Sequence, residues 1–425
     1  MREKLTSFVT ASILLLALAY AGFSQSGVAK KIDELVQPLA RNGQFSGVIV
    51  ASQNGTVIYE KAFGMANAEL KAPNTLGSRI GIASITKPMT AIILARLIES
   101  QKLALDDKLS KFIPDFPNGE KITVEMLSQH RSGILHRVMP DDQETRPYSS
   151  AEMIEKIKAS KLAFEPGTQR LYSSGGYTVL ARVLEIASGM SYQQLLQKYI
   201  FEPAKMTDTV DWDGPAIIER RTQDYLCGER GFINAPVKDY SFLVGSGSVI
   251  STASDIHKFA AAVVDGTYGA SAKASFVRSG QITSSGSTNG HRAYLELRDD
   301  KSYGFVILSN MGCGSFDFVQ RGIAEILQGK ELTTKTLTVP KLIPNPNKDL
   351  GEFTGRYKRT DGSEIEIVIR NGYLYSSDIK LHPVKPDCFF DFRYFGDACF
   401  VRDAAGKITS LRWTGVTFEL IWTRV

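Results

Sequence analysis

The chain has 425 residues, 43% of them hydrophobic and 22% charged, with a formal net charge of +5 at pH 7 and four cysteines. A chain of this length usually needs more than one hydrophobic core, so we expect at least two domains. The positive charge is small and dispersed along the sequence, which argues against a nucleic-acid-binding protein. The cysteines lack the C-x-x-C spacing of a metal site, so no metal ion is expected.

Residues 1–21 have the pattern of a secretory signal peptide. Arg2 and Lys4 precede an apolar run from Phe8 to Leu18, which an Ala-Tyr-Ala sequence follows. The run is short for a membrane span. We therefore expect an exported mature chain, periplasmic or secreted, with no stable membrane span and a net charge of +4, because Arg2 and Lys4 outweigh Glu3 by one. A retained N-terminal anchor is the alternative.

The next part of the chain, residues 22–335, is predicted to begin with a helix and a β-hairpin. Residues 28–41 have helical periodicity. Two apolar stretches, residues 45–52 and 56–61, then flank a Gln-Asn-Gly turn. A sheet is therefore expected to begin before the segment that contains Ser84.

The segment from Gly81 to Glu99 predicts a helix with one buried face. Its apolar residues recur at steps of three and four: Met89, Ile92, Ile93, Leu97 and Ile98. Ser84 and Lys87 fall at the start of this helix. Side chains three residues apart lie on the same face, so the Lys87 ammonium nitrogen can reach the Ser84 hydroxyl.

This pair of residues suggests nucleophilic catalysis. A serine hydroxyl needs a neighbouring base to attack a carbonyl, and a lysine is such a base only if burial or nearby cations lower its pKa. Unpaired backbone N–H groups at a helix start can also hold the negative charge on an oxyanion. The alternative for a Ser-x-x-Lys sequence alone is a helix-capping serine beside a solvated lysine.

Helical patterns dominate from residue 91 to about 255 and predict an all-α insertion with long loops, broken at Pro114, Pro117, Pro140, Pro147, Pro166 and Pro203. Residues 290–297 and 303–309 then predict a second hairpin, followed by a helix over 316–327. Sheet elements are therefore expected on both sides of the helical region.

The C-terminal part of the chain is predicted to be separate. Residues 336–350 carry three prolines, Pro340, Pro344 and Pro346, and indicate a linker. Residues 351–425 alternate polar and apolar side chains between Gly and Asp turns, which predicts a small all-β barrel or sandwich. Cys388 and Cys399 flank a short predicted hairpin and are the expected disulfide pair, with two buried free thiols as the alternative.

Five further segments follow the Ser-Ile-Thr-Lys motif along the chain. They are residues 121–133 (ending in His-Arg-Ser-Gly), Phe164 to Gly167, Tyr172 to Tyr177, Phe201 to Pro203, and residues 247–259. With these segments, residues 30–330 resemble the serine beta-lactamase and penicillin-binding-protein superfamily, in its class C, D-aminopeptidase and esterase branch. The resemblance implies an α/β (α+β) sandwich, in which helices flank an antiparallel sheet, with an all-α subdomain.

The resemblance implies catalytic roles for Ser84, Lys87 and Tyr172. Tyr172 stands where the family has the tyrosine of a Tyr-x-Asn motif, and as a phenolate it would take the Ser84 proton. A buried tyrosine with a satisfied hydroxyl is the alternative. Ser174 replaces the usual asparagine of this motif. It can bind substrate or Lys87, but it offers one donor where an amide offers two.

The family's third motif is placed at Ser284-Ser285-Gly286 on the strand beside the nucleophile, where these residues would contact substrate. Gly286 would let substrate backbone approach, and the Ser287 N–H would be the second oxyanion donor beside that of Ser84. Ser284 stands where relatives carry a cation or an imidazole, which weakens the case for substrates with a free carboxylate. Arg292 can compensate, or it is a solvated strand residue.

Two histidines invite a catalytic role, but the resemblance assigns them none. His291 lies five residues after Gly286, beyond the third motif, and His130 belongs to a helix-end turn where a structural hydrogen bond is expected. No Gly-rich phosphate loop is present, so no nucleotide cofactor is expected.

We therefore predict an exported serine hydrolase that forms an acyl-enzyme with a short ester, a D-amino-acid-containing peptide or a β-lactam, with an ester or D-peptide favoured. The partner would be a small-molecule or peptide substrate, including cell-wall fragments. The alternatives are a penicillin-binding sensor that is acylated but turns over poorly, and a non-catalytic envelope-binding protein. The C-terminal domain would cover or shape the active site, or be a structural appendage.

Overall fold

The computed structural model describes residues 27–212, 214–228, 231–332, 340–344, 349–377, 379–415 and 418–425. The predicted signal peptide lies outside these residues, as do residues 333–339 and 345–348 of the predicted linker. Within the described ranges, no helix combines the length and the apolar character needed to cross a lipid bilayer.

A six-stranded antiparallel sheet forms the centre of the larger part of the molecule, with strand order β10-β11-β12-β13-β1-β2. Its strands are β1 (Gly47–Gln53), β2 (Thr56–Phe63), β10 (Val277–Arg278), β11 (Gln281–Ser287), β12 (Arg292–Arg298) and β13 (Tyr303–Ser309). Both predicted hairpins are confirmed, as β1–β2 and β12–β13. The pairing of β1 with β13 joins the two ends of this part of the chain, with Gly47 opposite Ser309.

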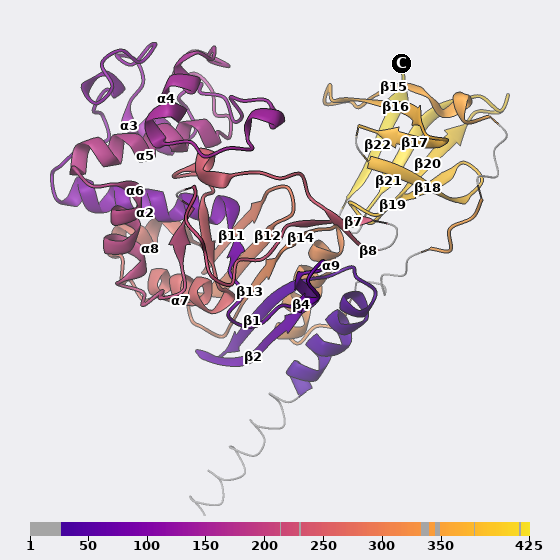
Figure 1. Ribbon diagram of the computed structural model, residues 1–425, viewed down its shortest axis with the longest axis horizontal. Helices are drawn as coiled ribbons and strands as arrows, with labels where there is room; N and C mark the ends of the chain where they lie inside the picture. The colour runs from indigo at the N-terminus through magenta and orange to yellow at the C-terminus, as the bar shows by residue number, and fades with distance from the viewer. Residues whose placement is uncertain are drawn as a thin grey trace, which may run out of the picture.

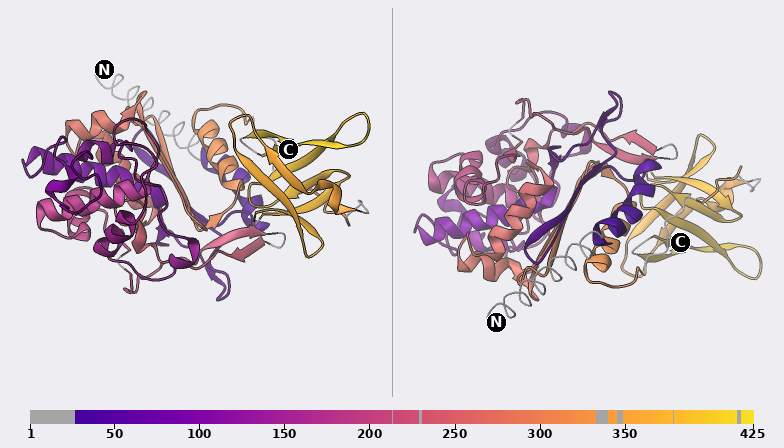
Figure 2. Two further views of the ribbon diagram at one scale, coloured as in Figure 1. Left: turned by 90° about the horizontal axis from the view of Figure 1, so that it is seen from above. Right: turned by 90° about the horizontal axis from the view of Figure 1, so that it is seen from below.

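Both faces of the sheet are covered, because neighbouring side chains on a strand point to opposite faces. On β1, Val48 and Val50 pack into one core, while Ile49 and Ala51 pack into the other. The first core contains α2 (Thr86–Glu99), α5 (Ser174–Ser188) and α7 (Ala253–Val264). The second contains a helix over 27–41 and α9 (Ser315–Leu327). Figure 2 shows the sheet edge-on between these two helical layers.

The region from residue 91 to 255 is mainly helical, with α3 (Val124–Ser128), α4 (Ser150–Lys158) and α6 (Tyr192–Leu196) around α5; α8 (Ala270–Phe276) follows it. The prediction of an all-α insertion is wrong for its second half, which contains β6 (Val210–Asp211), β7 (Tyr225–Gly228), β8 (Gly231–Asn234) and β9 (Val249–Ser251). These strands are too short to show alternation. Moreover, β9 pairs with β5 (Ile80–Gly81), which is far away in sequence.

Shorter elements connect the main ones. They are β3 (Met65–Asn67), β4 (Ala72–Pro73), β14 (Met311–Gly312), 3₁₀ turns at Ala83–Ile85, Leu109–Lys111, Asp141–Gln143, Tyr240–Leu243 and Leu350–Phe353, and a π turn at Gln197–Phe201.

The C-terminal strands close into an eight-stranded antiparallel barrel (Figure 1). They are β15 (Gly355–Lys358), β16 (Glu364–Arg370), β17 (Tyr373–Ser376), β18 (Ile379–Lys385), β19 (Cys388–Asp391), β20 (Gly396–Arg402), β21 (Ile408–Thr414) and β22 (Glu419–Arg424). Large side chains, among them Phe353, Tyr357 and Phe389, pack together inside the barrel. The predicted Cys388–Cys399 disulfide is confirmed, and it joins paired positions of β19 and β20.

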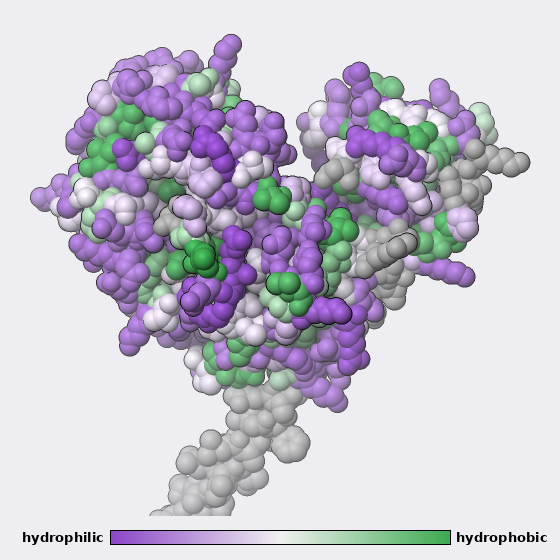
Figure 3. Space-filling model, in the orientation of Figure 1, coloured by the Kyte–Doolittle hydropathy of each residue, from purple (hydrophilic) through white to green (hydrophobic). Residues whose placement is uncertain are grey.

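The barrel contacts the larger part of the molecule at a second disulfide, between Cys227 of β7 and Cys313, which the sequence patterns did not pair. Phe390, Phe392 and Phe395 of the barrel pack against these two cysteines. Above this contact, the space-filling view shows a notch between the barrel and the rest of the protein, on a largely hydrophilic face (Figure 3).

Asp391 is a buried carboxyl in the barrel, and its environment predicts a pH-dependent stability. It accepts hydrogen bonds from Trp413 Nε1 at 2.7 Å and from the backbone N–H of Tyr394 at 2.6 Å. Burial outweighs these bonds and raises the pKa of Asp391 from 3.8 to about 6. The folded barrel therefore holds this proton more tightly than the unfolded chain, and the resulting stabilisation is lost as the pH rises from about 4 through 6.

We expect the free energy of unfolding of the barrel to fall by about 3 kcal/mol more in the wild type than in an Asp391→Asn variant between pH 4 and pH 7, because two pKa units correspond to about that energy. Urea titrations followed by tryptophan fluorescence at several pH values measure this difference. Equal pH dependence in the two proteins would contradict the assignment.

Candidate active site

A sharp turn places Ser84 at the entrance of α2. The chain leaves β5 and passes through the 3₁₀ turn Ala83–Ile85 before α2 begins at Thr86. Ala83 is buried and has φ of 47°, a left-handed conformation that is costly for a residue with a Cβ atom. Ser84 lies in the middle of this turn and lines a cavity of about 220 Å³.

Lys87 is 5% exposed and has three hydrogen-bonding partners. Its Nζ lies 3.1 Å from Ser84 Oγ, 3.2 Å from Ser174 Oγ and 2.8 Å from the carbonyl oxygen of Ser246. All three partners are neutral, so none offsets the cost of burying the ammonium group. Burial lowers the pKa of Lys87 to about 7. A substantial fraction of the protein therefore carries a neutral amine at this position near pH 7.

Tyr172 completes the group around the serine hydroxyl. Its OH lies 2.8 Å from Ser84 Oγ, and Lys87 Nζ lies 4.8 Å from the centre of its ring. Partial burial raises the pKa of Tyr172, and the hydrogen bond with Ser84 offsets this only in part. This direction favours the protonated phenol over the expected phenolate near neutral pH, because desolvation disfavours the charged form. Tyr172 is a neutral phenol there and a hydrogen-bond donor.

Two histidines hold the segment that carries Tyr172. The rings of His130 and His136 lie against Tyr172, with centroids 4.7 and 5.3 Å from its ring. Nδ1 of His130 accepts the backbone N–H of Ser173 at 3.1 Å, and Nδ1 of His136 accepts that of Ser174, also at 3.1 Å. The structural hydrogen bond expected of His130 is present. His136 also lines the cavity, and nothing in the sequence pattern indicated it.

Strand β11 runs beside the nucleophile turn. On one edge of β11, the short strand β10 pairs only with Gln281 and Ile282. The rest of that edge, which carries the predicted third motif, lies against the turn Ala83–Ile85. A Cβ atom on Gly286 would lie 2.1 Å from the carbonyl oxygen of Ile82 and 2.9 Å from the backbone nitrogen of Ser84. Glycine is therefore required here because the nucleophile turn itself comes so close, whatever the substrate.

The residues of the predicted third motif lie in different places. Ser287 lines the cavity together with Thr288 and Asn289, whereas Ser284, Ser285 and Gly286 do not. Arg292 does not compensate for the missing cation, because its guanidinium pairs with Asp317 of α9 at 2.5 Å.

His291 is held by contacts with Asp224 and Thr288, and no hydrogen bond joins it to Ser84 among the described residues. Its Nε2 lies 2.5 Å from Asp224 Oδ1, and its Nδ1 lies 3.2 Å from Thr288 Oγ1. Tyr240 donates its hydroxyl to Asp224 and also lies 2.9 Å from the carbonyl oxygen of Asn289. These contacts hold the loop that follows β11.

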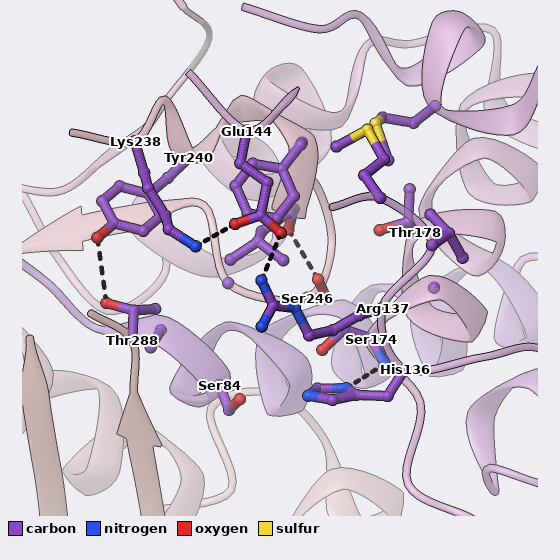
Figure 4. A pocket seen from close by; sticks show the side chains of 18 of the residues that line it. Ser84, His136, Arg137, Glu144, Ser174, Thr178, Lys238, Tyr240, Ser246 and Thr288 are labelled. Carbon is purple, nitrogen blue, oxygen red and sulfur yellow. Dashed lines mark hydrogen bonds and ion pairs between the residues drawn. The ribbon is translucent and has the colours of Figure 1, made fainter. Parts of the chain in front are cut away.

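Three charged side chains, Arg137, Glu144 and Lys238, line the cavity wall opposite Ser84 (Figure 4). Glu144 is almost completely buried and accepts hydrogen bonds from Arg137, at 3.0 Å, and from Lys238. Asp141 pairs with the same two cations, at 2.8 Å from Lys238. Two positive and two negative charges balance. The remaining wall is largely apolar and contains Val138, Met139, Met153, Phe242 and Leu243.

No described residue of the barrel lines this cavity. The barrel contacts the larger part of the molecule at the Cys227–Cys313 disulfide instead. Its described residues therefore do not shape this cavity, contrary to one of the two expectations for the C-terminal domain. Within the described residues, no group of three His, Cys, Asp or Glu side chains is arranged to hold a metal ion.

A Ser-x-x-Lys pair at a helix entrance, with a tyrosine over it and an antiparallel sheet beside it, defines the class of active-site-serine proteins with a beta-lactamase-like fold. The chain belongs to the Beta-lactamase family, whose sequence model matches residues 32–321.

Three known proteins illustrate the similarity. Penicillin-binding protein 4* of Bacillus subtilis (strain 168) is 28% identical over 247 residues, which cover 54% of each chain. Teichoic acid D-alanine hydrolase of Staphylococcus aureus (strain MRSA252) is 26% identical over 232 residues, covering 54% of this chain and 56% of the relative. The chain thus spans about half the length of these curated relatives. A crystal structure of SurE matches with a TM-score of 0.61 and 19% identity, covering 95% of this chain and all of that one, which shows a shared fold.

Proposed function

We propose that this protein is an exported serine hydrolase that cleaves an ester or amide through a covalent acyl-enzyme on Ser84. The observation that carries the proposal is the contact of Ser84 Oγ with a buried amine at 3.1 Å and a phenol at 2.8 Å. Such an arrangement supplies a base and a proton donor on the two sides of a nucleophilic oxygen.

In the acylation step, the neutral amine of Lys87 accepts the proton of Ser84 as Oγ forms a bond to the substrate carbonyl carbon. The carbonyl oxygen becomes an oxyanion, which the backbone N–H groups of Ser84 and Ser287 would stabilise. The tetrahedral intermediate then expels the leaving oxygen or nitrogen, which takes a proton from Tyr172 or from the Lys87 ammonium. Ser84 remains bound to the acyl group as an ester.

Deacylation uses the same groups on water. A water molecule gives a proton to whichever of Lys87 and Tyr172 protonated the leaving group, as its oxygen attacks the ester carbonyl. The Ser84 oxygen leaves and recovers a proton, which releases a carboxylic acid and the free enzyme.

The substrate we favour is a short ester or a D-amino-acid-containing peptide, including one derived from the cell wall, over a β-lactam. The two cations of the wall opposite Ser84, Arg137 and Lys238, are each already paired with Glu144 and Asp141, and Ser284 supplies no cation, so a free carboxylate would find little positive field there. A D-alanine hydrolase and a penicillin-binding protein among the relatives fit this class. Export is supported by the signal-peptide pattern and by the two disulfides, which form in oxidising compartments.

The test is mass spectrometry of the intact protein after addition of a reactive ester, a D-aminoacyl ester or a chromogenic cephalosporin, followed by peptide mapping of the adduct. We expect an adduct on Ser84 that disappears within minutes while product accumulates. A persistent adduct would instead identify a sensor, and no adduct with any of the three reagents would identify a binding protein. Initial rates on the same reagents then rank ester, D-aminoacyl and β-lactam substrates.

A further inference from the structure

His136 is a cavity residue whose hydrogen-bonding state the structure defines. It lies six residues after His130, in the loop between α3 and α4, and it lines the same cavity as Ser84. Its Nδ1 accepts the backbone N–H of Ser174, the first residue of α5. That N–H is one of the groups at a helix start that has no partner within the helix.

This hydrogen bond decides which ring nitrogen carries the proton. A nitrogen that accepts an N–H cannot itself be protonated, so the proton of a neutral ring must be on Nε2. Burial, Lys87 and Arg137 all lower the pKa of His136, which keeps the ring neutral near pH 7. Nε2 is therefore a donor and cannot act as a base in this tautomer.

The donor faces the reaction centre. Figure 4 shows the second ring nitrogen of His136 on the side of the ring toward Ser84, opposite the bond to Ser174. No acceptor for Nε2 is found among the described residues. An N–H in this position is available to a bound molecule, and a substrate group that accepts it would lie beside the scissile carbonyl.

We propose that His136 is a substrate-binding residue that donates its Nε2–H to an acceptor atom in the acyl half of the substrate, selecting acyl groups that carry a second carbonyl. Ser174 offers one hydroxyl donor at this point, and Lys87 already binds its oxygen at 3.2 Å. His136 lies next to Ser174 and supplies a second donor, so the two residues together present what a single side-chain amide presents.

This inference rests on the proposed function, and it specifies the substrate class as acyl groups such as N-acylamino acyl groups. The apolar part of the cavity, with Met139 and Met153, would take the remainder of the acyl chain. An apolar acyl group of the same length would fill the cavity but leave the His136 donor unpaired, which costs binding energy in a desolvated site.

The experiment compares two p-nitrophenyl esters of equal chain length, that of N-acetylglycine and that of pentanoic acid, in the full-length protein. We expect His136→Leu to lower kcat/KM for the N-acetylglycyl ester at least about tenfold more than for the pentanoyl ester. His136→Gln should keep most of the wild-type ratio, because its amide can accept the Ser174 N–H and still donate. His257→Gln, which changes a histidine of α7 that is bonded to Ser52 of β1, serves as the matched control and should leave the ratio unchanged.

If His136→Leu lowers kcat/KM equally for both esters, the role of His136 is purely structural and the proposal is overturned. If His136→Leu leaves both kcat/KM values unchanged, the proposal is overturned as well. If His136→Leu does not fold, the glutamine variant decides, since loss of the ratio there also overturns the proposal. Absence of a Ser84 adduct in the wild type with both esters would instead overturn the proposed hydrolase function, so the two failures are distinguishable.

Discussion

Ser84→Ala is expected to lower kcat/KM for the best ester by about 10³-fold or more and to abolish the covalent adduct, while leaving the fold intact. Without the hydroxyl no acyl-enzyme can form, and the residual rate would come from oxyanion stabilisation and substrate binding alone. Ser84 is partly exposed at a turn, and removal of its hydroxyl deletes only two hydrogen bonds, those from Lys87 and from Tyr172. The measurement is steady-state hydrolysis together with mass spectrometry of the intact protein.

The matched control is Ser254→Ala, which changes a partly exposed serine of α7 that donates to Glu60 at 3.0 Å. Its activity should equal that of the wild type. A Ser84→Ala protein with more than a tenth of the parental activity would show that another group is the nucleophile, and acyl transfer through Ser84 would then be wrong.

Lys87→Met is expected to abolish hydrolysis and, at the same time, to make the protein more stable at pH 7. Activity is lost because the base is removed. Stability rises because burial lowers the pKa of Lys87 from 10.5 to about 7, so that the unfolded chain binds this proton more tightly than the folded protein. The gain is about 1–3 kcal/mol, since the lost hydrogen bond to the Ser246 carbonyl oxygen offsets part of it.

The sign of this effect has a pH signature. Between pH 7 and pH 10 the wild type is expected to gain stability relative to Lys87→Met, because the unfolded chain still binds a proton at Lys87 that the folded protein has released, and raising the pH makes that binding less favourable. Urea titrations at both pH values measure the difference, with the exposed Lys102→Met as the control. In the wild type, kcat/KM should also fall below pH 7 as Lys87 becomes protonated. A destabilised Lys87→Met variant, or a pH-independent rate, would contradict this assignment.

Local patterns predicted the parts of the site that lie close together in sequence. Ser84 and Lys87 are three residues apart at a helix entrance, and the geometry of one helical turn is enough to bring the two side chains together. The hairpins β1–β2 and β12–β13 and the strands of the barrel were predicted for the same reason, because alternation of polar and apolar residues is a local signal. The Cys388–Cys399 pair followed from the predicted hairpin around it.

Other features depended on contacts between distant segments and were missed or wrongly predicted. The strands β7 and β9 are stabilised by partners far away in sequence, and so is the Cys227–Cys313 disulfide, which spans 86 residues. The direction in which the pKa of Tyr172 shifts depends on burial, which no motif encodes. Resemblance to a family placed Tyr172 near Ser84, but it said nothing of His136.

The sequence by itself determined the proximity of Ser84 and Lys87, the sheet hairpins and the C-terminal β-structure, since each of these is specified by residues within a few turns or strands of one another. Only the tertiary structure decided which amine is neutral, which phenol keeps its proton, which loops enclose the cavity, and that the described part of the barrel stays outside its walls. These properties arise from desolvation and from packing between segments that are far apart along the chain, and both exist only once the chain has folded.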